Sequence, residues 1–416
     1  MLLTQEYKEY WSLSSKLVFR LIFTYFSLYI FFRFTGSFFE TPFKYIGKSI
    51  LDITYNYHVN GEGSGDNTYA YITLFMNAIL TVFIVVFWTF MDRKRNSYNT
   101  LLYWFLALLR IILILSMFLY GSVKIFQLQF PQPSLIRLLE PLGNFSPMGL
   151  AWTYMGYSEG FNMFTGFMEV LGALLLIPRR TQTLGAFIIM GVMTHVAMMN
   201  FMFDIPVKLL SSHLLAMATV IFMTDSQRFV NVFFKNRGTT VLNYYHPVKD
   251  KTYHKAIFWI KTIVLSIIII GVGIYGHEAE QKQGPNREKP FLYGIWETSH
   301  FIKNGDTIAP LITDRNRWKY IIVEYKDKVT VKAMNDKKYH YDFVVDSTSQ
   351  QIKLYRGLSE YDDFNFTYEH SNPDDLKLKG IFLRDTLKII LKRKDLNDFN
   401  LKSRGFRWIN ETPYNK

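Results

Sequence analysis

The 416-residue sequence contains no cysteine. A chain without cysteine forms no disulfide, and it offers no thiolate metal ligand, no cysteine nucleophile and no CxxC redox pair. Any electron transfer by this protein would therefore need a bound cofactor. Acidic residues are also in the minority, because 34 Asp and Glu face 47 Lys and Arg and leave a net charge of +13. Such a basic excess points to nucleic acid or to a membrane, and the positions of the charges decide between them.

Hydrophobic residues make up 49% of the sequence and aromatic residues 17%. The mean hydropathy of +0.05 is too apolar for a typical soluble protein of this size and too polar for a chain that lies wholly in lipid. This mixture predicts a membrane domain joined to a soluble domain.

Seven apolar runs have the length of about 20 residues that a helix needs to cross a bilayer. The first run has no small-residue cleavage site after it, so we interpret it as an uncleaved anchor rather than a signal peptide. The expected spans cover residues 17–34, 69–91, 100–122, 159–177, 182–202, 205–224 and 256–276.

The lysines and arginines near the ends of these spans predict an orientation. Thirteen of them fall on the side of the N-terminus, and four, Lys44, Lys48, Lys124 and Arg137, fall on the other side. Because basic loops stay in the cytoplasm, the N-terminus is expected inside and the C-terminus outside. Much of the positive charge then has a topological origin, and we expect no nucleic-acid partner.

A polar linker is expected at 277–290, and after it apolar and polar residues alternate with a period of two. This alternation is typical of antiparallel strands with one buried face, and we expect about eight or nine strands in 291–410. A closed barrel or a sandwich would hide the strand edges. The runs that carry the pattern are Val329/Val331/Ala333, Tyr339/Tyr341/Phe343, Phe364/Phe366/Tyr368 and Leu387/Ile389/Leu391.

The first and last stretches of this domain, FLYGIWE and RGFRWIN, resemble the ends of lipocalin-like barrels. In that family a GxW tryptophan packs beneath an arginine from the closing strand, which here implies Trp296 beneath Arg404 or Arg407. Another β architecture is the alternative. A lipocalin-like barrel holds an apolar ligand in some proteins and is filled by its own side chains in others.

Residues 100–225 contain four of the expected spans and resemble the DoxX family of bacterial membrane proteins, a four-helix unit. The stretches that carry the resemblance are FLYGSVKIF, FNMFTGFMEVLGALLLIPRRT and the hairpin FDIPVKLLSSHLL, with matching positions Gly121, Lys124, Glu169, Gly172, Leu174–Leu176 and Arg180. The four-helix unit also looks distantly similar to the membrane core of vitamin K-dependent carboxylases. The resemblance does not extend to the first, second and seventh spans or to the β domain.

The resemblance implies quinone chemistry, because one type of DoxX protein is associated with thiosulfate:quinone oxidoreduction and the carboxylases act on a quinol. It also implies a bacterial inner membrane, with the β domain in the periplasm. The expected organisation is two spans with an outer loop (1–99), the four-helix core (100–225), a basic cytoplasmic loop (226–255), the seventh span (256–276), the linker (277–290) and the β domain (291–416).

Ionisable residues inside a span are rare and point to a functional site. Spans five and six are expected to meet at an outer turn near Asp204. His195 and His213 each lie nine residues from that turn, about 13 Å deeper, and Asn200 and Lys208 lie four residues from it. We therefore expect a histidine layer for proton transfer with quinone, and above it Asn200, Asp204, Lys208 and Lys124 as ligands of the head group.

Arg110 and Glu169 are expected at similar depth in the cytoplasmic half of the core, where an ion pair would hold both charges in the bundle interior. A structural clamp is the simpler interpretation of this pair. Two histidines without a third ligand at their level do not make a metal site, so we expect no metal. Trp152 in the apolar outer loop 129–162 belongs either to an interfacial aromatic belt or to a lid over the bundle.

These observations predict a polytopic α-helical membrane protein that binds a quinone or a similar prenyl lipid, with membrane redox chemistry as its expected activity. The alternative is a non-enzymatic scaffold or lipid-handling protein whose β domain (291–416) binds an envelope protein or an apolar ligand. A transporter is disfavoured because the sequence shows no evident internal repeat.

Overall fold

The computed structural model describes residues 5–53, 64–239, 244–248, 250–356 and 364–415. The chain forms two compact units. The helical unit contains Met1–Phe130 and Ser146–Glu280, and the β unit contains Pro131–Phe145 and Gln281–Lys416. The expected combination of membrane helices and a β domain is confirmed. The expected boundary differs, because residues 131–145 belong to the β unit and not to the four-helix core.

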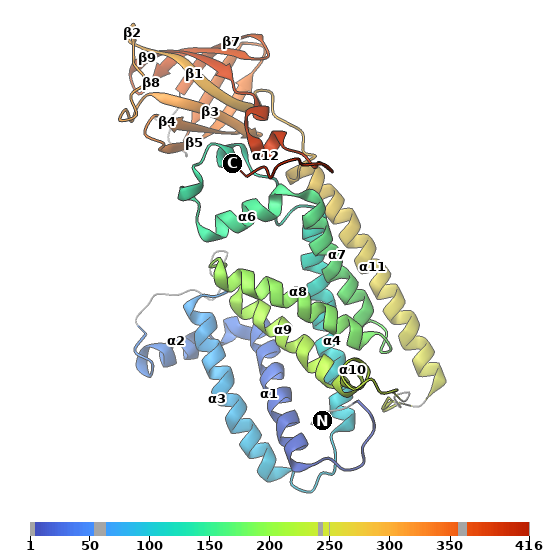
Figure 1. Ribbon diagram of the computed structural model, residues 1–416. Helices are drawn as coiled ribbons and strands as arrows, with labels where there is room; N and C mark the ends of the chain where they lie inside the picture. The colour runs from blue at the N-terminus through green and yellow to red at the C-terminus, as the bar shows by residue number, and fades with distance from the viewer. Residues whose placement is uncertain (1–4, 54–63, 240–243, 249, 357–363, 416) are drawn as a thin grey trace. The chain divides into compact units, whose positions relative to one another are not determined.

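Helices form at all seven expected spans (Figure 1). Within the described residues, five helical segments are long and apolar enough to cross a membrane, and α9 with α10, bent by 72°, would make a sixth. Helix α7 has 18 residues and is not among these segments. The helices of this unit are α1 (Leu13–Thr35), α2 (Glu40–Ser49), α3 (Thr68–Met91), α4 (Asn99–Ile125), α6 (Pro147–Tyr157), α7 (Glu159–Leu176), α8 (Gln182–Met202), α9 (Lys208–Met223), α10 (Ser226–Phe233) and α11 (Lys251–Gln283).

Side-chain caps explain where several of these helices begin. Ser12, Asn67, Ser146 and Ser158 each accept a hydrogen bond from the backbone N–H three residues later. Such a bond satisfies one of the N–H groups that the first turn of a helix leaves without a partner. The seventh span differs from its expected bounds, because α11 continues to Gln283 and so takes in the first half of the expected linker.

Helices α4, α7, α8 and α9 form a four-helix bundle, in which α4 packs on α7, α7 on α8, α8 on α9 and α9 on α4. Glycines allow the closest approach. A Cβ atom on Gly121 would lie 2.7 Å from the carbonyl oxygen of Gly166, and one on Gly185 would lie 2.9 Å from that of Gly172. Small residues at such crossings let helix backbones approach closely in a membrane.

The β unit contains an antiparallel barrel. Its strands are neighbours in sequence order, and β1 pairs with β9 to close the barrel, while the two-residue β2 extends one end of β1. The expected alternation is confirmed, since Val331, Phe366 and Ile389 are each at most 1% exposed. The strands are β1 (Gly294–Lys303), β2 (Asp306–Thr307), β3 (Trp318–Tyr325), β4 (Lys328–Ala333), β5 (Lys338–Asp346), β6 (Gln351–Tyr355), β7 (Phe364–Asn372), β8 (Asp375–Phe382) and β9 (Asp385–Arg393).

The expectation that Arg404 or Arg407 of the closing strand covers Trp296 is wrong. The closing strand is β9, whose last residue Arg393 is the register partner of Trp296 and donates to the Tyr293 carbonyl at 2.9 Å. Arg404 instead lies over the Tyr414 ring, and the stretch RGFRWIN contains no strand. The strand stops because Asp395 begins a turn, in which its carboxylate accepts the N–H of Asn397.

Trp296 is only 1% exposed and occupies the barrel interior, as expected for a GxW tryptophan. Its indole N–H donates to the Leu292 carbonyl at 2.9 Å, and the ring meets His370 edge-on with centroids 5.7 Å apart. Together with the other inward side chains it packs the interior with apolar atoms. A barrel interior built in this way serves stability.

Candidate functional site

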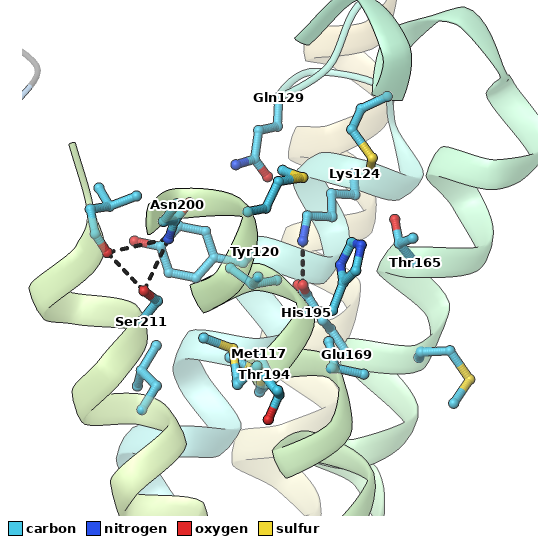
Figure 2. A pocket seen from close by; sticks show the side chains of 18 of the residues that line it. Met117, Tyr120, Lys124, Gln129, Thr165, Glu169, Thr194, His195, Asn200 and Ser211 are labelled. Atoms are coloured by element: carbon cyan, nitrogen blue, oxygen red, sulfur yellow. Dashed lines mark hydrogen bonds and ion pairs between the residues drawn. The ribbon is translucent and has the colours of Figure 1, made fainter. Parts of the chain in front are cut away.

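The helical unit contains a cavity of about 870 Å³ among α4, α6, α7, α8 and α9 (Figure 2). Its lining is mostly apolar and includes seven methionines. Methionine is flexible and polarisable, so such a wall adapts to irregular apolar ligands. A small set of polar side chains shares the cavity, and the labelled ones in Figure 2 include Tyr120, Lys124, Gln129, Thr165, Glu169, His195, Asn200 and Ser211.

The charged centre of this cavity is an ion pair between Lys124 of α4 and Glu169 of α7. Both side chains are buried, with 6% and 1% of their surface exposed. Each lies three residues after one of the glycines at the α4–α7 crossing, Gly121 and Gly166, so the close backbones bring the two side chains together. One carboxylate oxygen, Glu169 Oε2, has no hydrogen-bond partner among the described residues.

The expected ion pair between Arg110 and Glu169 is wrong. Arg110 donates to the carbonyl oxygens of Leu176 (2.9 and 2.7 Å) and Ile177 (2.5 Å), the groups that the end of α7 leaves without helical partners. The estimate of depth failed because the two helices are offset along their axes. Helix α7 ends at the level of Arg110, eleven residues or about 16 Å inside the start of α4.

The two candidate histidines lie in different surroundings, and only His195 lines the cavity. His213 is 6% exposed and packs against α1, where its ring stacks on Tyr29 with centroids 3.8 Å apart. His213 Nδ1 lies 2.6 Å from the Leu209 carbonyl oxygen and must donate to it, and Nε2 forms a hydrogen bond of 2.8 Å with the Tyr25 hydroxyl. His213 is therefore a structural link between α9 and α1. The expected histidine layer does not form one site.

The expected head-group ligands also separate into two sets. Asn200 is 3% exposed, lines the cavity and donates to Ser211 Oγ at 3.0 Å. Asp204 and Lys208 form an ion pair of 2.8 Å, but neither lines the cavity, and 84% of the Asp204 side chain is exposed. Lys124 and Asn200 thus remain as candidate ligands, while Asp204 and Lys208 form a pair at the turn between α8 and α9.

The sequence analysis did not identify two residues that the structure places at or near the site, Gln129 and Asp66. Gln129 lines the cavity, and its Oε1 is buried without a partner among the described residues. Asp66 accepts the backbone N–H groups of Lys208 (2.6 Å) and Leu209 (3.0 Å) and so caps α9 from another part of the chain. The sequence does not reveal that Asp66 caps α9. Asp66 and Asn67 directly precede α3, so they are naturally interpreted as the N-cap of that helix.

No family model matches the sequence, and no solved structure matches it. The resemblances to DoxX proteins and to lipocalins therefore remain predictions. A protein of Bacillus subtilis (strain 168), named uncharacterized protein YwoB, is 34% identical to this chain over 127 residues, which are 30% of this chain and 80% of YwoB. Because the match covers most of that relative, the chain belongs to the same family as YwoB.

Proposed function

We propose that the protein binds an isoprenoid quinone or a similar prenyl lipid in the cavity of the helical unit, with the head group against Lys124 and Glu169. The observation that carries this proposal is Glu169 Oε2, a buried carboxylate oxygen that faces a cavity without a hydrogen-bond partner among the described residues. A buried acceptor without a partner is costly, and a ligand that donates to it would remove the cost.

The charges around the cavity favour a neutral head group. Lys124 and Glu169 neutralise one another, and the remaining polar groups of the lining are hydroxyls, amides and the imidazole of His195. A phosphate head group would therefore meet no net positive charge. The isoprenoid quinones have neutral oxygens on a ring and a long apolar tail, which suits the methionine-rich wall.

The polar residues of the cavity fit both forms of such a head group. Lys124 can donate to a ring oxygen, and Glu169 Oε2 can accept from a ring hydroxyl of the reduced form. His195 faces the same cavity and can take up or release the proton of that hydroxyl. A bound quinone would supply the two-electron chemistry that a chain without cysteine lacks.

Lipid extraction tests this proposal. Protein purified in mild detergent is extracted with organic solvent, and prenyl lipids are quantified by mass spectrometry. We expect close to one quinone per protein in the wild type and loss of it in the cavity variant Lys124→Met/Glu169→Leu. The matched control Asp204→Asn/Lys208→Gln removes an ion pair outside the cavity and should retain the lipid. Equal lipid content in both variants, or none in the folded wild type, would refute the proposal.

A second candidate function rests on the end of the β unit. Phe406, Trp408 and Ile409 are 81%, 90% and 76% exposed, an unusual run of large apolar side chains. Exposed apolar patches of this kind mark interaction sites. We infer as the alternative that the β unit binds an envelope protein through this segment. Crosslinking from a photoreactive residue at position 408 tests it, with exposed Ile312 as the control position.

A further inference from the structure

The connection between α4 and α7 passes through both units. The chain leaves the helical unit at Phe130, and it returns at Ser146. The fifteen residues between them, 131–145, belong to the β unit and are called the docking segment here. A loop between two membrane helices is thus an internal part of the β unit.

Apolar packing fixes the docking segment in the β unit. Its short helix α5 (Leu135–Leu138) places Leu135, which is 1% exposed, in a cluster with Ile295 of β1 and Ile322 of β3. Leu396 and Phe399, which follow β9, pack against the same cluster. A leucine buried to this extent is a core residue of the β unit.

Polar contacts fix the backbone of the segment as well. The N–H of Leu135 donates to Glu324 Oε2 at 3.1 Å, and Lys332 Nζ donates to the carbonyl of Leu139 at 3.1 Å. Glu140 Oε2 forms an ion pair with Lys338 Nζ at 3.4 Å. These contacts hold the segment at both ends of α5, so the segment is docked and does not merely lie on the barrel.

Both flanks of the docking segment line the cavity of the helical unit. Gln129 and Phe130 come directly before it, and Met148, Trp152 and Met155 of α6 come soon after it. The flanks also contact each other, since Trp152 meets Phe130 edge-on with centroids 5.0 Å apart. Only four residues separate Phe130 from Leu135, so the chain between them spans at most about 18 Å and the connection is short.

We propose that the β unit restrains the wall of this cavity: by holding the docking segment in one folded conformation, it restricts the movement of Gln129, Phe130 and α6, which flank the segment in the chain. Release of the segment from the β unit frees that wall and opens the cavity. The proposal gives the β unit a role that needs no ligand in the barrel. It applies to any ligand of the cavity and does not depend on the quinone.

The absence of cysteine makes a direct test simple. A single reporter, Thr165→Cys, is placed in the cavity lining, and the rate of its reaction with a maleimide is measured in the full chain. The undocking variant is Leu135→Ser. The matched control is Leu142→Ser, the same substitution in the same segment at a side chain that is 69% exposed. We expect the undocking variant to raise the labelling rate at least about fivefold, because local opening controls access to the reporter, and the control to leave it unchanged.

Hydrogen exchange provides the second readout. Peptides from α6 should lose protection in the undocking variant, while those from β3 and β9 should keep it. If Leu135→Ser unfolds the barrel, a four-residue Gly/Ser insertion between Phe145 and Ser146 replaces it, because this insertion loosens the connection without changing the β unit. Unchanged labelling and exchange in the insertion variant would overturn the proposal. Prenyl-lipid content is measured separately, so an opened cavity without lipid would refute the quinone and leave the restraining role intact.

Discussion

The helical bundle and the β barrel each close a ring of amphipathic elements around an interior, but they treat that interior differently. The barrel fills its interior with side chains such as Trp296, Phe366 and Ile389, none more than 1% exposed. The bundle leaves a cavity of about 870 Å³ and places in it the carboxylate of Glu169, one oxygen of which has no partner among the described residues. A filled interior contributes stability, whereas an open one with a polar centre is suited to a ligand. The comparison supports the proposal that a ligand binds in the bundle and not in the barrel.

The largest expected effect comes from breaking the buried ion pair of the bundle. Lys124→Met leaves the Glu169 carboxylate buried without its cation, and removal of one partner from a buried pair costs about 3–5 kcal/mol. We expect the free energy of unfolding, measured in mixed detergent micelles, to fall by that amount. The double variant Lys124→Met/Glu169→Leu should recover most of it, because a neutral apolar pair needs no desolvated charge. A double variant as unstable as Lys124→Met would show that the pair is not the cause.

Truncation of a phenylalanine tests the difference between the two interiors directly. Phe366→Ala in the barrel should cost about 3–5 kcal/mol, since it creates a void in a packed core. Phe164→Ala removes a side chain that lines the cavity and is 58% exposed, so it should change stability by about 0.5 kcal/mol or less. Its effect should fall on retained lipid instead. Similar losses of stability in both variants would contradict the contrast between a filled and an open interior.

Sequence periodicity was sufficient to predict the helices and strands, because each of them has a recognisable pattern of apolar residues. Alternation of the Leu387/Ile389/Leu391 type led to the strands, and apolar length led to the helices. The docking segment could not be found in this way. Leu135 and Leu142 are both leucines of one loop, and only the contacts with Ile295 and Ile322 make the first a core residue.

The candidate site was predictable only in part. The position of a residue along its own helix does not reveal how far the neighbouring helix is shifted along its axis. Lys124, Glu169, His195 and Asn200 were identified from the sequence and line one cavity. The partner of Glu169 was not, since α4 and α7 are offset and Lys124 rather than Arg110 reaches it. His213 was misassigned because its direction around α9 places it against α1.

The helix crossing beside the ion pair offers a third test. Gly166→Ala would place a methyl group 2.5 Å from the carbonyl oxygen of Gly121, so α4 and α7 must move apart, at a cost of about 1–3 kcal/mol. Gly160→Ala on the same helix meets nothing within 4 Å and serves as the control. Thermal unfolding in detergent should separate the two variants. Equal melting temperatures would mean that the crossing tolerates the wider spacing.

A smaller effect is expected at the start of α9. Asp66→Ala removes the carboxylate that accepts the N–H groups of Lys208 and Leu209, and loss of such a cap costs about 0.5–2 kcal/mol. Hydrogen exchange at these two amides should rise in Asp66→Ala and less so in Asp66→Asn, which keeps one acceptor oxygen. Protection that survives in Asp66→Ala would show that another group caps the helix.

The smallest effect concerns pH and lies in the β unit. Burial raises the pKa of Glu324 above its ordinary value of 4.5, against the opposing influence of the Leu135 N–H and Arg287. Between the ordinary and the raised pKa the folded state binds more protons than the unfolded state, so the free energy of unfolding falls as pH rises through that range. Glu324→Gln does not titrate and keeps an acceptor oxygen for Leu135. Its stability relative to the wild type should therefore increase from pH 4.5 upward and then level off, as followed by exchange of the β3 amides. A Glu324→Gln profile parallel to the wild type would mean that burial of this carboxyl group carries no cost.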